Sequence, residues 1–125
     1  MVQAVLAATL LIPFPTSDPG FNYFATPSGR IVCSYGGGGV DCTNFESGRT
    51  NDGELGQRIW TIEHRGHGTT KVVVGNAPDE APKAEYGVTY TYKTIKCRIH
   101  RIRGIRCANR QGHGFRVSVE RQRTF

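Results

Sequence analysis

The four cysteines of this 125-residue chain constrain its fold more than any other feature. They form two close pairs, Cys33 with Cys42 and Cys97 with Cys107. Four cysteines allow three pairings, but each close pair brackets its own short segment with turn-forming glycines. Four thiolates around zinc normally lie two to four residues apart in each pair, whereas eight and nine residues separate the cysteines here. We therefore expect two disulfides, each closing a hairpin.

The glycines predict the turn of each hairpin. If the first cysteine pair faces across an antiparallel ladder, the midpoint falls between Gly37 and Gly38. A two-residue primed turn there needs positive φ, which glycine adopts without a steric penalty. In the second hairpin the midpoint is Ile102, so the loop has an odd number of residues. That spacing predicts a three-residue turn with Gly104 as its left-handed bulge residue.

The two hairpins have similar sequences. Residues 31–44 and 95–109 both read Ile-x-Cys, followed by Gly, then Val or Ile, and then x-Cys-x-Asn. The second segment has one additional residue in its loop. This pattern predicts a repeated hairpin.

The rest of the chain alternates strand-like runs with turns. We expect a third hairpin from residues 57–64 and 69–74, a surface loop at 75–82, a tyrosine-bearing strand at 86–92 and a last strand at 115–119. No run has the length and 3.6-residue period of a helix. The fold class is therefore all-β: a small antiparallel sheet or sandwich of six or seven short strands built from hairpins, two of them disulfide-clipped.

Length limits the chain to one domain, at 13.8 kDa. Residues 1–17 begin with an apolar run that proline ends, and this run is shorter than the ~20 residues a membrane-spanning helix needs. It is typical of a signal peptide, although no Lys or Arg precedes it, and an apolar N-terminal arm is the alternative. We expect residues 18–125 to form a single disulfide-stabilised β domain, with no transmembrane span.

A family pattern runs through the domain. Its elements are Phe24-x-Thr26-Pro27-Ser28-Gly29-Arg30-Ile31-x-Cys33, Gly104-Ile105-x-Cys107-x-Asn109 and Gly112-His113-Gly114-Phe115. Over about residues 21–125 the chain resembles a domain of unknown function found in small exported actinobacterial proteins. It lacks the additional central cysteine pair that members often carry, and it has Arg30 where they commonly have Asn. The resemblance implies secretion and disulfide bonding, and it implies no activity.

Charge is unevenly distributed along the sequence. Residues 1–92 carry 6 Lys plus Arg and 9 Asp plus Glu, a net of −3, whereas residues 93–125 carry 10 and 1, a net of +9. Alternation in the second hairpin places its cations on one strand face and extends them across the tip. Such a surface attracts anionic partners. The predicted basic patch comprises Lys96, Arg98, His100, Arg101, Arg103, Arg106 and Arg110.

Catalytic patterns are weak by comparison. His64 and His67 lie in a predicted turn with Glu63 as the nearest further ligand, which favours a polar hairpin tip over a metal site. A phosphodiester hydrolase would use Glu63 with His64, His100 or His113 as acid and base, but no spacing singles out such a site. We expect no catalytic residue, metal or cofactor.

These observations favour a secreted, non-enzymatic binding module at the cell envelope. Its basic hairpin would engage an anionic envelope component or a protein partner, and any nucleic-acid binding would be non-specific, because no recognition helix is expected. One alternative is an accessory structural subunit of a larger complex, docked through its apolar N-terminal arm. The other is a small secreted phosphodiester hydrolase.

Overall fold

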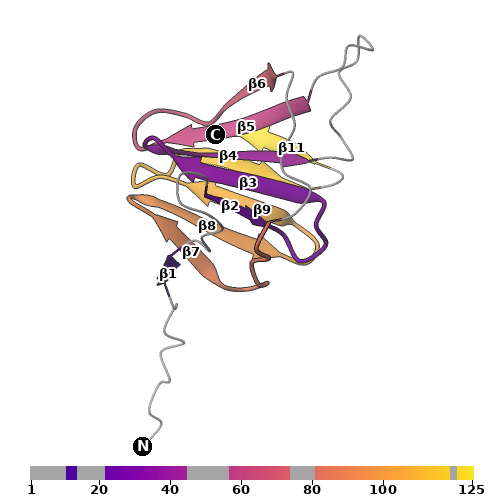
Figure 1. Cartoon of the computed structure of the whole chain (residues 1–125). Coiled ribbons are helices and arrows are strands. Elements are labelled where there is room, and N and C mark those ends of the chain that lie inside the picture. Colours follow the sequence, from indigo (N-terminus) through magenta and orange to yellow (C-terminus); the bar gives the residue numbers. More distant parts are fainter. Residues whose placement is uncertain (1–10, 14–21, 45–56, 74–80, 119–120) are drawn as a thin grey trace, which may run out of the picture.

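The protein is a β-sandwich of two stacked sheets, as seen in a computed structural model (Figure 1). The structure describes residues 11–13, 22–44, 57–73, 81–118 and 121–125. These residues form strands and turns and contain no helix, so no helix in this part of the chain could cross a membrane. The prediction of an all-β, hairpin-built fold is confirmed.

Eleven strands occur in the described residues, against the six or seven expected. They are β1 (Leu11–Pro13), β2 (Tyr23–Ala25), β3 (Ile31–Gly36), β4 (Gly39–Asn44), β5 (Gln57–Glu63), β6 (Thr69–Val73), β7 (Thr89–Tyr92), β8 (Ile95–His100), β9 (Gly104–Ala108), β10 (Gly114–Val117) and β11 (Gln122–Thr124). Three of them, β1, β2 and β11, have only three residues each. Runs that short show no measurable period.

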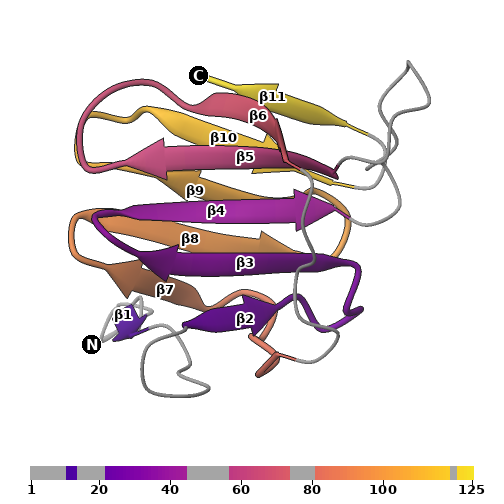
Figure 2. The same cartoon turned by 45° about the horizontal axis from the view of Figure 1, so that its top comes forward.

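Both sheets follow the order of the chain. One sheet is the antiparallel meander β2-β3-β4-β5-β6, and the other is the antiparallel meander β7-β8-β9-β10-β11 with β1 added in parallel beside β7. Figure 2 shows the sheets face to face, with both meanders rising in the same direction from β2 and β7 to β6 and β11. The β1 strand lies within the leader-like segment, most of which falls outside the described residues.

The two predicted disulfides are present, and both are in the core. The Cys33–Cys42 bond joins directly paired residues of β3 and β4, and the Cys97–Cys107 bond does the same for β8 and β9. All four cysteines are fully buried. They pack in one apolar cluster with side chains from both sheets. Each disulfide therefore reinforces a hairpin at the centre of the sandwich.

The turns have the predicted conformations. Gly37 and Gly38 have φ values of 58° and 91°, as the two central positions of a type I′ turn require. The three-residue loop after β8 leads into Gly104, which has φ 75° and is paired with His100. A Cβ atom on Gly104 would also lie 1.9 Å from the Val117 carbonyl oxygen, so both backbone conformation and packing require glycine there.

The other strand predictions agree with the structure in part: β7 begins only at Thr89, with Tyr86 in the turn before it, and β10 is followed by a further strand, β11. β5 and β6 form the third hairpin. Tyr90 is buried and Tyr92 partly buried against the core, and Phe115 and Val117 of β10 are fully buried. Val119 and most of the predicted loop at 75–82 lie outside the described residues.

The sequence repeat extends well beyond the hairpins. Five residues pair laterally across each meander, Phe24-Cys33-Cys42-Trp60-Thr70 in one and Tyr90-Cys97-Cys107-Phe115-Thr124 in the other. The two rows match position by position, with each disulfide at the second and third places. The described meanders β2–β6 and β7–β11 therefore have the same five-stranded layout.

Contacts between the two meanders are reciprocal. Asn44, at the end of β4, donates a hydrogen bond from Nδ2 to the Ser118 carbonyl oxygen at 3.0 Å. Its counterpart Asn109, at the end of β9, donates from Nδ2 to the Glu63 carbonyl oxygen at 3.2 Å. Glu63 and Ser118 are themselves equivalent, since each lies three residues after the aromatic residue of its row. Such exchange of equivalent contacts is what a two-fold relationship between the units produces.

Candidate anion-binding face

Four arginines form a straight row across the outer face of the β7–β11 sheet. Arg98 of β8 pairs with Arg106 of β9, Arg106 pairs with Arg116 of β10, and Arg116 pairs with Arg123 of β11. Laterally paired residues of a sheet project from the same face. The neighbouring positions on these strands, including Cys97, point into the core. We call Arg98, Arg106, Arg116 and Arg123 the arginine row.

The sequence-predicted patch lies only partly on this row. Arg98 and Arg106 belong to it, and Lys96 and His100 lie on the same face of β8. Arg103 lies in the adjacent turn and acts electrostatically on both His100 and Arg116.

Arg101 and Arg110 lie away from the row. The Arg101 guanidinium lies 5.1 Å from the centre of the Tyr86 ring, beside a pocket. Arg110 lies in the turn between β9 and β10, at the opposite end of the sandwich from the β8–β9 turn.

Arg116 and Arg123 are the members that sequence reasoning missed. The alternation of the last strand already places Arg116 opposite Phe115 and Val117, on the outer face. Its alignment with the hairpin arginines depends on the register between β9, β10 and β11, which local sequence does not specify. The repeat was the available signal. Each arginine of the arginine row directly precedes or follows, in sequence, a residue of the inward-facing row that contains Cys97 and Cys107.

Arg116 is the member of the arginine row with the most positive charge around it. Burial lowers the pKa of the Arg116 guanidinium, and the charges of Arg123, Arg103 and Arg106 lower it further. Its Nε atom is buried and has no hydrogen-bond partner among the described residues. The same environment extends to His100, whose pKa is lowered first by burial and then by Arg98, Arg103 and Arg116.

One aromatic ring is built into this face. The Arg106 and Arg123 guanidinium carbons lie 4.8 and 5.5 Å from the centre of the Phe125 ring. Cation–π contacts of this kind hold the guanidinium groups against the ring and orient them. Beside them, Arg116, Arg121, Gln122 and Arg123 line a hollow of about 530 Å³.

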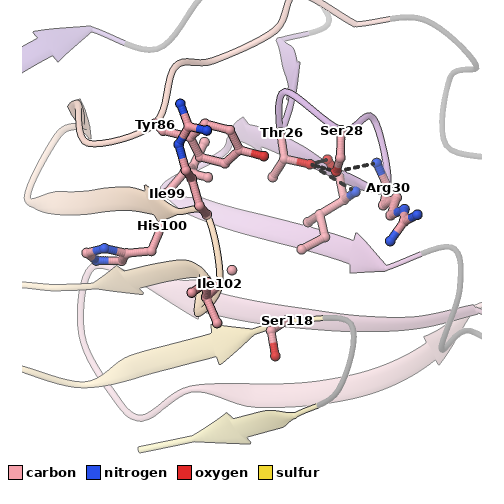
Figure 3. A pocket seen from close by; sticks show the side chains of 11 residues that line it. Thr26, Ser28, Arg30, Tyr86, Ile99, His100, Ile102 and Ser118 are labelled. Atoms are coloured by element: carbon pink, nitrogen blue, oxygen red, sulfur yellow. Dashed lines mark hydrogen bonds between the residues drawn. The ribbon is translucent and has the colours of Figure 1, made fainter.

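A second concavity of about 390 Å³ opens at the end of the sandwich that bears the β8–β9 turn. Figure 3 shows Tyr86 on one side of it, Thr26 and Ser28 of the β2–β3 turn on another, and Ile102 with Ser118 below. The Thr26 and Ser28 hydroxyls lie 3.1 Å apart in a mutual hydrogen bond. Ile102 is 92% exposed. This pocket adjoins the basic face, because the β8–β9 turn contributes to both.

The residues considered for hydrolysis are divided between the two ends of the sandwich. His100 lies at the end of β8, whereas His64 and His113 lie in turns at the opposite end of the sandwich. His64 Nδ1 is 2.8 Å from the Thr94 hydroxyl, and the His113 ring lies against that of His67 with centroids 3.8 Å apart. Across the described residues, no three His, Cys, Asp or Glu side chains gather as metal ligands would.

The arginine row thus offers positive charge for binding an anion. Comparison of the chain with known family models, with curated proteins and with solved structures found no match.

Proposed function

We propose that the protein is an exported, non-enzymatic binding module that uses its arginine row to engage an anionic partner at the cell envelope. The observation that carries this proposal is the alignment of four arginines on neighbouring strands. Like charges directly opposite one another destabilise a sheet. An anionic partner would offset that repulsion.

Export is supported by the cysteines. All four form disulfides, and such bonds persist in oxidising compartments outside the cytoplasm. The apolar start of the sequence and the resemblance to exported actinobacterial domains point in the same direction. A signal peptide and an envelope location are parts of this proposal.

The role of the arginine row is tested by retention on isolated envelope material. The test variant is Arg98→Glu with Arg106→Glu. The matched control is Arg58→Glu with Arg65→Glu, which makes the same change in net charge on exposed residues of the β2–β6 sheet and its β5–β6 turn. We expect the test variant to lose at least tenfold in retention, and wild-type retention to fall as salt rises.

The control variant should bind nearly as well as wild type, because the partner would contact one face. Equal loss in both variants would show a response to net charge alone and would contradict the proposal. Circular dichroism establishes that each variant is folded, so that a loss of retention reports the surface and not unfolding.

A further inference from the structure

The arginine row has a direction and a spacing. Adjacent strands lie ~4.8 Å apart, so three intervals from β8 to β11 span ~14 Å perpendicular to the strands. The equivalent row of the other sheet consists of Ser34, Asp41, Thr61 and Thr69. Four aligned arginines are therefore a property of this face and not of the repeated fold.

These charges have no acidic counterpart among the described residues. The charges that lower the Arg116 pKa are all arginines, and its Nε atom lacks a partner. Arg98 is exposed, and the charges that act on the neighbouring His100 are likewise arginines. The face thus presents a row of positive charge that the described acidic residues do not neutralise.

The geometry restricts the shape of that ligand. Each guanidinium fork matches the paired oxygens of a phosphate or carboxylate group. A compact anion reaches neighbouring arginines only, whereas a row of ~14 Å needs acidic groups that recur at about the interstrand spacing. A single-stranded nucleic acid is disfavoured, because it binds by stacking bases on open aromatic rings. Phe125, the ring that contacts the row, is occupied by Arg106 and Arg123.

We infer that the ligand is an unbranched, non-aromatic polyanion with a phosphate or carboxylate on each monomer, lying along the arginine row and across the strands. This inference rests on the proposed function and narrows the partner to a chemical class. Phosphate and carboxylate chains share the required chemistry, so the experiment includes both.

The test measures affinity by calorimetry for linear polyphosphates and oligogalacturonates of increasing length. Inositol hexakisphosphate serves as the compact anion and oligothymidylate as the nucleic acid. For at least one of the two polymers, affinity should rise more than tenfold until the chain spans four arginines, and then level off. A chain of equal charge should bind at least tenfold more tightly than the compact anion. A preference for the compact anion, or an absence of length dependence, would overturn the inference, and so would tighter binding of oligothymidylate.

Variants within the row test its direction. Arg98→Gln with Arg123→Gln leaves only the two central arginines, so affinity should level off at about one third of the wild-type chain length. Each Arg→Gln change should also reduce the slope of log affinity against log salt by about 0.7. The control Arg65→Gln, in the β5–β6 turn, should leave both the length profile and the slope unchanged. An unshifted length profile in the Arg98/Arg123 variant would refute binding along the row.

The outcomes separate this inference from the proposed function. If envelope retention depends on the arginine row but linear chains bind no better than the compact anion, the binding role stands and the polymer assignment fails. If retention is indifferent to the row, the proposed function itself fails.

Discussion

Asn109 provides a sharp test of how the two sheets are held together. The residue is 5% exposed, and its carboxamide makes four hydrogen bonds. Nδ2 donates to the carbonyl oxygens of Glu63, at the end of β5, at 3.2 Å and of Gly66, in the β5–β6 turn, at 3.0 Å. Oδ1 accepts from the backbone amides of Gln111 at 3.0 Å and His113 at 3.1 Å, in its own turn. One side chain thus orders a turn and ties it to the other layer.

Replacement by alanine should cost about 4 kcal/mol, because four hydrogen bonds worth about 1 kcal/mol each are lost. A loss of that size is a large fraction of the 5–15 kcal/mol typical of a small domain. Asn109→Asp keeps both acceptor contacts and loses both donor contacts to the other sheet. It should therefore cost at least about 2 kcal/mol at neutral pH, with added repulsion between the carboxylate and the two carbonyl oxygens.

Urea unfolding followed by the fluorescence of Trp60 measures these losses. Trp60 is the single tryptophan, it is buried, and it lies on β5, the strand that Asn109 reaches. Arg110→Ala is the control in the same turn: its side chain is exposed, and the change should cost less than about 0.5 kcal/mol. A loss below about 1 kcal/mol for Asn109→Ala would refute the reasoning.

Three further measurements follow from the described contacts. Replacing either disulfide pair with alanine should lower the free energy of unfolding by about 2.7 kcal/mol, because the loop-closure entropy of the unfolded chain rises. The two losses should be nearly equal, since the sequence separations are 9 and 10. Losses that differ several-fold in urea titrations would contradict this. Folding lowers the His100 pKa below 6.5, so the unfolded chain binds more protons just below that pH and wild-type stability should rise as pH increases to 6.5. The His100→Gln variant should lack the increase in stability that comes from His100. An identical pH dependence of stability in the variant and the wild type would contradict this role of His100. Burial raises the Asp41 pKa above 3.8, so its ionised form is penalised in the folded state. The stability of Asp41→Asn relative to wild type should therefore increase as pH rises from 3 to 7. If thermal melts show that this relative stability decreases instead, the Asp41 pKa is not raised by folding.

The parts of the fold that the sequence predicted are those that local chemistry determines. The Gly37-Gly38 turn and the Gly104 bulge each follow from a few neighbouring residues, because positive φ restricts the choice of residue. The disulfides follow from the same hairpins, since each turn places its two cysteines opposite one another.

Long-range arrangement was harder to predict. The short edge strands carry too few residues to show alternation, and their pairing depends on the finished core. The arginine row was missed for a related reason: Arg116 and Arg123 join Arg98 only through the registers of three successive strand pairs. Arg110 was placed in the patch by proximity in sequence, whereas the chain reverses between it and the row.

The position of the disulfides has a mechanical consequence. Each bond joins neighbouring strands within one sheet, and the four cysteines are all used in this way. Covalent cross-linking therefore stiffens each layer and leaves the distance between the layers unrestrained. Separating the two sheets would break neither disulfide, so non-covalent contacts hold them together, among them the apolar core and the Asn44 and Asn109 carboxamides.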